Sequence, residues 1–167
     1  MNHTIALAFP SLDGAHAMRK ALGELCRSDL AGIVDAAVVD RLENDSVRIR
    51  QARELIGYGV LYGSAWGALM GLMFLAPWLG ATAKSMGELH AQRFKIAGID
   101  SAFINGVRET TWPGQSILFL VVNRWDGICA FHVLAQSDAA IVRTTMPAAE
   151  DARFRAFFVG AASNPAV

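Results

Sequence analysis

The stretch from Leu55 to Ala83 decides what kind of protein this chain is, and it runs LIGYGVLYGSAWGALMGLMFLAPWLGATA. It contains no Asp, Glu, Lys, Arg or His, although the 167-residue chain has 15 basic and 15 acidic residues. A helix needs about 20 apolar residues to cross the hydrocarbon core of a membrane, and this stretch is longer than that. It therefore predicts an apolar helical block that interrupts an otherwise ordinary charged chain.

Glycines recur at every fourth residue in the first part of this block, as Gly59, Gly63, Gly67 and Gly71. Each glycine inside an exposed helix costs roughly 1 kcal/mol relative to alanine, so four in a row need a compensating reason. Small residues four apart allow two helix backbones to approach closely. The row predicts a helix-packing face that also serves self-association.

A second helical arm is expected after Pro77, with Gly80 and Gly87 continuing a face of small residues. This arm also carries charges, including Lys84, and a charge at the centre of a bilayer costs several kcal/mol. Two arrangements remain open. The block forms either a hairpin inserted into a membrane or a hairpin buried between the copies of a homo-oligomer.

The flanks of the block are basic. Before it stand Arg48, Arg50 and Arg53, and after its turn stand Trp78 and Lys84. Basic residues beside a membrane segment favour the cytoplasmic side, and tryptophan favours the interface. These five residues are the predicted membrane interface. For the three arginines the first interpretation is the solvated face of a strand, and contact with anionic lipid beside the apolar block is the functional alternative.

The rest of the chain predicts an α+β domain. Strands are expected at 4–9, 33–42, 47–52, 116–122 and 139–144, and helices at 12–28, 100–109, 124–135 and 148–159. The order β-α-β-β-[block]-α-β begins the ferredoxin-like split βαβ pattern, and the last α-β-α extends it. We expect residues 1–52 and 97–167 to form one domain, with 53–96 as a glycine-zipper hairpin inserted into it.

Catalytic residues are not evident from the residue spacing. The four histidines fall on separate predicted elements without a metal-ligand spacing, and no nucleophile has a base beside it. Asp35 and Asp40 lie five residues apart on one strand, so we expect them on opposite faces. We predict no enzyme activity, no metal and no cofactor.

Two further features bear on partners and compartment. Basic and acidic residues balance, so no net positive field attracts nucleic acid, and we expect no nucleic-acid partner. Cys26 and Cys129 are far apart in sequence, without a CxxC motif. We predict two free thiols in a reducing compartment, each buried on its own helix.

Several segments together resemble the bacterial domain-of-unknown-function family 1269, a family of predicted membrane proteins. The segments are TIALAF, DAAVV, SAWGALMGLMFLAPWLGA, GIDSAFI, PGQSILFLVV and IVRTTMPAAEDARFRAF, which span nearly the whole chain. The resemblance implies a membrane-associated or self-associating protein and supplies no catalytic residues.

The sequence therefore predicts a non-enzymatic protein that anchors to a lipid membrane through its glycine-rich hairpin and associates with itself. The expected location is the bacterial inner membrane, with the α+β domain on the cytoplasmic side. The alternative is a soluble homo-oligomer with bundled apolar hairpins, whose α+β domain binds or senses a small ligand.

Overall fold

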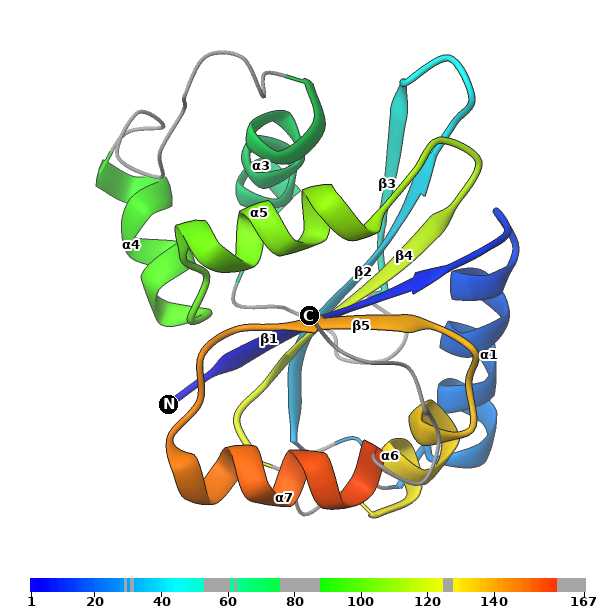
Figure 1. Cartoon of the computed structure of the whole chain (residues 1–167), viewed down its shortest axis with the longest axis vertical. Coiled ribbons are helices and arrows are strands. Elements are labelled where there is room, and N and C mark those ends of the chain that lie inside the picture. Colours follow the sequence, from blue (N-terminus) through cyan, green and yellow to red (C-terminus); the bar gives the residue numbers. More distant parts are fainter. Residues whose placement is uncertain are drawn as a thin grey trace.

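The structure is a computed structural model of the whole chain, and it describes residues 1–28, 30, 32–52, 61, 63–75, 88–124 and 128–158. The fold is mixed α+β (Figure 1). Its strands are β1 (His3–Phe9), β2 (Ile33–Arg41), β3 (Val47–Gln51), β4 (Ser116–Val122) and β5 (Ala140–Arg143). Its helices are α1 (Gly14–Leu25), α3 (Gly63–Met70), the π-helix η1 (Gly71–Leu75), α4 (Glu88–Ile96), α5 (Ser101–Thr110), α6 (Ile128–Ala135) and α7 (Ala148–Phe158).

The five strands form one antiparallel sheet in the order β3-β2-β4-β1-β5. All seven residues of β4 are buried, as the continuous apolar run SILFLVV predicts. Such a run suits a central strand whose two faces are both covered. Leu120 of β4 lies opposite Ile5 of β1 on one side and Ala36 of β2 on the other.

The place of β3 differs from the expected pattern. The sequence predicts that β3 is one of the four strands of the ferredoxin-like unit. In the structure β3 instead lies at the edge of the five-stranded sheet, beyond β2. Its sequence VRIRQ alternates apolar and basic residues, and Arg48 and Arg50 are exposed. A strand with one polar face suits an edge, whereas the wholly apolar β4 takes the central position between β1 and β2.

Helices cover both faces of the sheet (Figure 1). On one face α1, α6 and α7 pack against alternate strand residues, including Leu7, Val38 and Leu118. On the other face α3, η1, α4 and α5 pack against the intervening residues, including Val39 and Phe119. The strands therefore have a core on each side, which explains why β1 and β4 have no exposed residue.

The described part of the apolar block belongs to the second of these cores. Trp66 of α3 is fully buried, and its ring centroid lies 5.6 Å from that of Phe119 on β4. Leu69 and Met73 are also fully buried in the same cluster. The domain boundaries remain a prediction, but α3 and η1 share one core with the sheet.

The predicted transmembrane helix is wrong. No helix within the described residues is long and apolar enough to cross a membrane. The chain leaves α-helical geometry at Gly71, after the eight residues of α3, and η1 adds only five more. Within the described part of the block, Trp66, Leu69 and Met73 are buried in the core beside the sheet.

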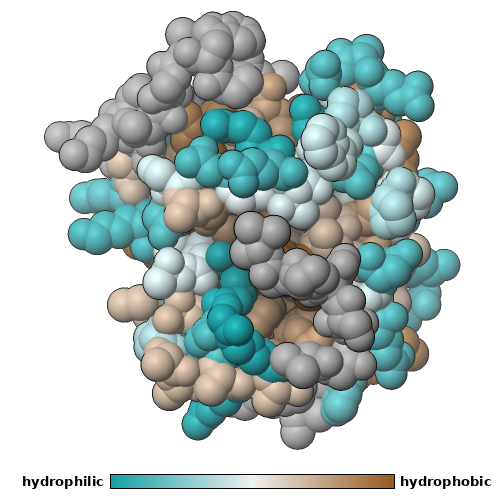
Figure 2. Space-filling view, viewed as in Figure 1, coloured by the Kyte–Doolittle hydropathy of each residue, from teal (hydrophilic) through white to brown (hydrophobic). Residues whose placement is uncertain are grey.

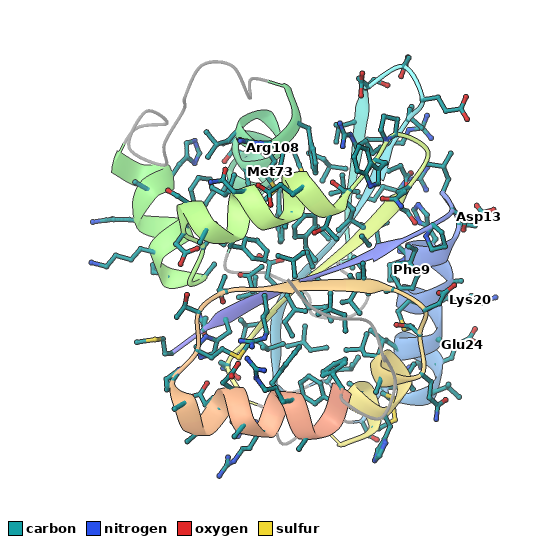
Figure 3. The ribbon with its side chains drawn as sticks, in the orientation of Figure 1. Phe9, Asp13, Lys20, Glu24, Met73 and Arg108 are labelled. Atoms are coloured by element: carbon teal, nitrogen blue, oxygen red, sulfur yellow. A yellow bond between two sulfur atoms is a disulfide. The ribbon has the colours of Figure 1, made fainter. Side chains whose placement is uncertain are left out.

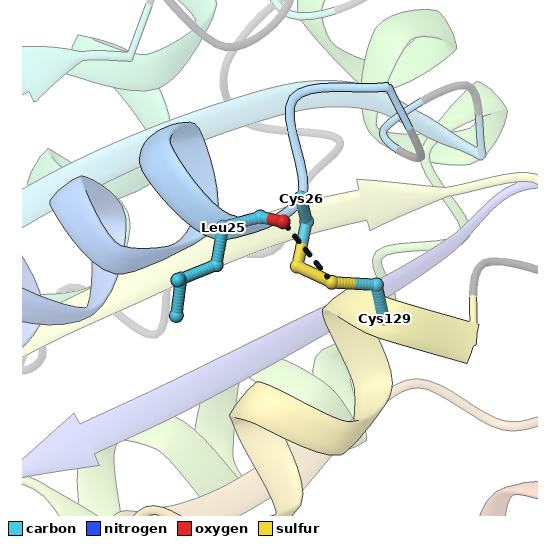
Figure 4. The surroundings of a disulfide bond; sticks show 3 residues. All are labelled: Leu25, Cys26 and Cys129. Atoms are coloured by element: carbon cyan, nitrogen blue, oxygen red, sulfur yellow. Dashed lines mark hydrogen bonds between the residues drawn. A yellow bond between two sulfur atoms is a disulfide. The ribbon is translucent and has the colours of Figure 1, made fainter.

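The predicted pair of free thiols is also wrong. Cys26 and Cys129 form a disulfide, with Cα atoms 5.7 Å apart (Figure 4). Cys26 caps the C-terminal end of α1, and Cys129 is the second residue of α6. The two helices lie over the same face of the sheet, which brings the cysteines together across 103 residues of sequence. This proximity is tertiary, so the spacing of the cysteines did not indicate it.

Candidate functional site

A buried carboxylate fixes the start of α3. Asp35 is fully buried in β2, next to an irregularity in the strand between Ile33 and Asp35. Its Oδ2 accepts a hydrogen bond from the backbone N–H of Leu61 at 2.5 Å, and its Oδ1 accepts one from the indole Nε1–H of Trp66 at 3.3 Å. Hydrogen bonds to a charged acceptor are stronger than neutral ones. The helix is therefore anchored to the sheet at its first turn.

A guanidinium group fixes the other end of this helical segment. Arg108 of α5 donates from Nε to the carbonyl oxygen of Met73 at 3.0 Å and from Nη2 to that of Leu72 at 3.1 Å (Figure 3). These carbonyls belong to η1, and the arginine satisfies acceptors near the end of the helix. Arg41 lies over the Phe74 ring, 5.0 Å from its centroid. Asp35 and Arg108 together make α3–η1 a rigid part of the domain.

The side of α3–η1 that faces away from the sheet carries only small residues. Ser64 and Gly67 are exposed, and Gly71 is half-buried. We call these three residues the outer face of α3. A Cβ added at Gly67 or Gly71 would meet no atom within 4 Å in the described part of the chain. Packing against the described residues of the same copy therefore does not explain either glycine.

A second feature is an open groove of about 540 Å³ along α1. Most of its described lining is charged or polar, and Figure 3 shows Asp13, Lys20 and Glu24 along this helix. The corresponding right-hand side of Figure 2 is mostly hydrophilic. The full described lining is Asp13, His16, Ala17, Arg19, Lys20, Gly23, Glu24, Arg27 and Leu30.

His16 in this groove is held by a buried acid. Its Nε2 lies 2.7 Å from Oδ1 of Asp40, which is 6% exposed. Ser116 is the register partner of Asp40, so a serine, a histidine and an aspartate come close together. The serine is fully buried, however, and its hydroxyl donates to the carbonyl of Ser11 and accepts from the N–H of Ala15. The three residues brace the N-terminal end of α1 and do not form a nucleophile with its base.

The prediction that Asp35 and Asp40 lie on opposite faces is confirmed. Asp35 contacts α3 on one side of the sheet, and Asp40 contacts His16 of α1 on the other. Among the described residues no group of three or more acidic, histidine or cysteine side chains is placed to hold a metal ion.

The structure covers only part of the predicted interface residues. Gly63, Gly67 and Gly71 lie on α3 and η1, whereas Gly59, Gly80 and Gly87 are outside the described residues. Of the predicted membrane-interface residues, Arg48 and Arg50 are exposed on the edge strand β3. The others, Arg53, Trp78 and Lys84, are outside the described residues.

Two residues that position the site were not predicted. Asp35 stands in the otherwise apolar run IVDAAVV, and an acid within a buried strand indicates a partner in the core. Arg108 had no such sequence signature, because an exposed-face arginine on a helix usually points to solvent.

Comparison with known proteins gives one match. The family model described as "Protein of unknown function (DUF1269)" matches residues 60–159. The chain belongs to the DUF1269 family. The match includes α3, η1 and the elements from α4 to α7, and it leaves out the TIALAF and DAAVV segments that also suggested the resemblance. No curated protein and no solved structure matches this DUF1269 protein.

Proposed function

We propose that this DUF1269 protein is a non-enzymatic, self-associating protein whose copies pack through the outer face of α3. The observation that carries the proposal is the pair Gly67 and Gly71, at which an added Cβ would meet no atom of the described residues within 4 Å. A helix loses roughly 1 kcal/mol of stability for each glycine that replaces alanine in its exposed interior. A second backbone that approaches this face would compensate for that loss.

A second copy of the chain fits this face better than an unrelated partner of high charge. Ser64, Gly67 and Gly71 carry no charge, so two copies meet there without like-charge repulsion. A surface that is flat and built from small residues is also complementary to itself, as a twofold contact requires. Asp35 and Arg108 hold α3–η1 in place, so little conformational entropy is lost when the face is covered.

The test compares two substitutions at one position by sedimentation velocity. Gly67→Leu places a branched side chain where two backbones would meet, and such overpacking costs about 1–3 kcal/mol. We expect its association to weaken by about 5-fold to 150-fold. Gly67→Ala adds only a methyl group, so we expect assembly to be retained and the helix to be stabilised.

Gly23→Leu on α1 is the matched control, because it makes the same chemical change on a helix at the opposite face of the sheet. It should leave assembly unchanged. Equal masses for wild type and Gly67→Leu over the whole concentration range would contradict the proposal, since the glycine would then serve no contact between copies.

The groove along α1 supports a second candidate function, the binding of a small charged ligand. Its lining mixes acids and bases, and the His16 ring is oriented by Asp40. Polar groups held in place before binding are a feature of ligand sites. Titration with single amino acids, nucleotides and dicarboxylates, followed by NMR of the His16 ring, tests this function. A ligand-induced change in the chemical shifts of the His16 ring that is lost in Asp40→Asn would support ligand binding in this groove. His16 signals that do not change with any of the three ligand classes would count against it.

We also propose that the α+β frame is a ferredoxin-like one in which β1, β2, β4 and β5 are the four strands. The order β2-β4-β1-β5 and the position of α1 and α6 on one face support this assignment. β3, α3, η1, α4 and α5 then form one long insertion between β2 and β4.

A further inference from the structure

The two cysteines differ in their access to solvent. Cys26 is 1% exposed at the C-terminal end of α1, whereas Cys129 is only partly buried at the start of α6. They are the only cysteines in the chain. A reagent in solution can therefore reach the sulfur of Cys129 and not that of Cys26.

The surroundings of Cys129 also favour a reactive sulfur. As the second residue of α6, it lies at the end of the helix where free backbone N–H groups and the helix dipole stabilise a thiolate.

The position of Cys129 relative to α1 holds the two sulfurs together. Its Sγ lies 3.5 Å from the carbonyl oxygen of Leu25 (Figure 4). The Cα separation of 5.7 Å is within the usual range for a disulfide, so the bond forms and breaks without movement of either helix.

We propose that Cys129 is a peroxide-reactive cysteine and that Cys26 is its resolving partner. The Cys129 thiolate attacks one oxygen of a hydroperoxide, the O–O bond breaks, and an alcohol or water leaves with the proton that the thiol lost. The product is a sulfenic acid on Cys129. The Cys26 sulfur then attacks Sγ of Cys129, the S–O bond breaks and water leaves. Two thiols and one hydroperoxide are thereby converted to one disulfide, one alcohol and one water.

The oxidation is reversed by thiol–disulfide exchange with a dithiol reductant, which attacks the accessible Cys129 sulfur and releases Cys26 as a thiol, so the pair acts as a reversible redox switch and not as a peroxidase. Oxidation fastens the end of α1 to the start of α6, and reduction releases it. This inference is independent of the outer face of α3, because the disulfide lies on the opposite face of the sheet.

The test uses the full chain, reduced with a dithiol, freed of reductant and treated with one equivalent of hydrogen peroxide. We expect loss of both thiols and formation of the Cys26–Cys129 disulfide, seen by intact mass and peptide mapping. In Cys26→Ser, dimedone should trap a sulfenic acid on Cys129. In Cys129→Ser, the reaction should fall to the rate of free cysteine.

Three results would overturn the proposal. The first is a dimedone adduct on Cys26 in Cys129→Ser together with an unreactive Cys129 in Cys26→Ser. The second is wild-type oxidation no faster than that of free cysteine at the same pH. The third is loss of the native circular dichroism spectrum on reduction, because the disulfide would then be a structural requirement and not a reversible pair.

Discussion

The two faces of the sheet are covered by helices that are held in different ways. On the α3 side, side chains bond to the backbone inside an apolar core, as Asp35 does at one end and Arg108 at the other. On the α1 side, a disulfide joins α1 to α6, and the partly exposed ion pair Arg143–Asp151 joins β5 to α7. The hydrogen bonds of Asp35 and Arg108 do not respond to redox conditions and are shielded from salt. On the α1 side, the disulfide responds to reductant and the ion pair near the surface responds to salt.

The outer surfaces of the two helical layers differ as well. α1 carries charged side chains along its groove, whereas the outer face of α3 carries none. Exposed glycines within a helix are costly in a protein that stays monomeric, because each exposes backbone and contributes no side-chain packing. This difference is the reason why we place the proposed contact between copies at the outer face of α3 and the candidate ligand site at the groove along α1.

The largest effect is expected from Trp66→Ala. It removes a fully buried side chain that contacts Phe119 and donates to Asp35. Substitutions of this kind cost about 3–5 kcal/mol of unfolding free energy. Urea denaturation monitored by circular dichroism measures the loss. A loss below 1 kcal/mol would mean that α3 is not an integral part of the core.

A smaller effect is expected when both cysteines are replaced, as in Cys26→Ser with Cys129→Ser. The disulfide closes a loop of about a hundred residues, and removal of such a bond usually costs about 2–4 kcal/mol. Phe131 and Leu134 remain buried under α1, so the variant should still fold. The wild type in reductant should show the same denaturation midpoint as this variant. A reductant-insensitive wild type would indicate that the bond does not contribute to stability.

The smallest effect concerns the acid at the start of α7. Arg155, which donates a hydrogen bond to it, and Arg143 hold the pKa of Asp151 below its ordinary value. The charge of Asp151 therefore stabilises the folded protein at pH values above the pKa that this group has in the unfolded chain. The stabilisation is lost as the pH falls through the lower pKa that the group has in the folded protein. Asp151→Asn should be slightly less stable than wild type at neutral pH and equally stable in strong acid.

The control for this prediction is Asp45→Asn in the β2–β3 turn, where Arg41 lies 3.5 Å away and the aspartate is well exposed. A difference for Asp151→Asn that stays constant from neutral pH to strong acid would show that Arg143 and Arg155 do not act through the charge of Asp151.

Most secondary structure was predictable because local patterns determine it. The run SILFLVV became β4 with the same bounds, and Asp100 caps α5 through a bond from the N–H of Phe103 at 2.8 Å. Both depend on residues close together in sequence. The change from α3 to η1 at Gly71 was not predictable, because it depends on Arg108, which is 37 positions later.

The sites were predictable only in part. The glycine spacing predicts a contact face, and this stays a prediction; the structure shows only that Gly67 and Gly71 have no packing partner among the described residues. The same block was mistaken for a membrane span, because apolar composition does not distinguish a lipid-facing helix from one that faces a sheet. The disulfide and the Asp35 anchor depend on tertiary contacts that no spacing reveals.

One measurement tests the central claim most directly, namely that the outer face of α3 is a contact between copies. Ser64→Cys places a thiol on this face, and Lys95→Cys places one at an exposed position on α4 as a matched control. With the native disulfide left intact, a short bis-maleimide should crosslink Ser64→Cys into dimers and leave Lys95→Cys largely monomeric. Equal crosslinking at the two positions, or none at Ser64→Cys, would contradict the account.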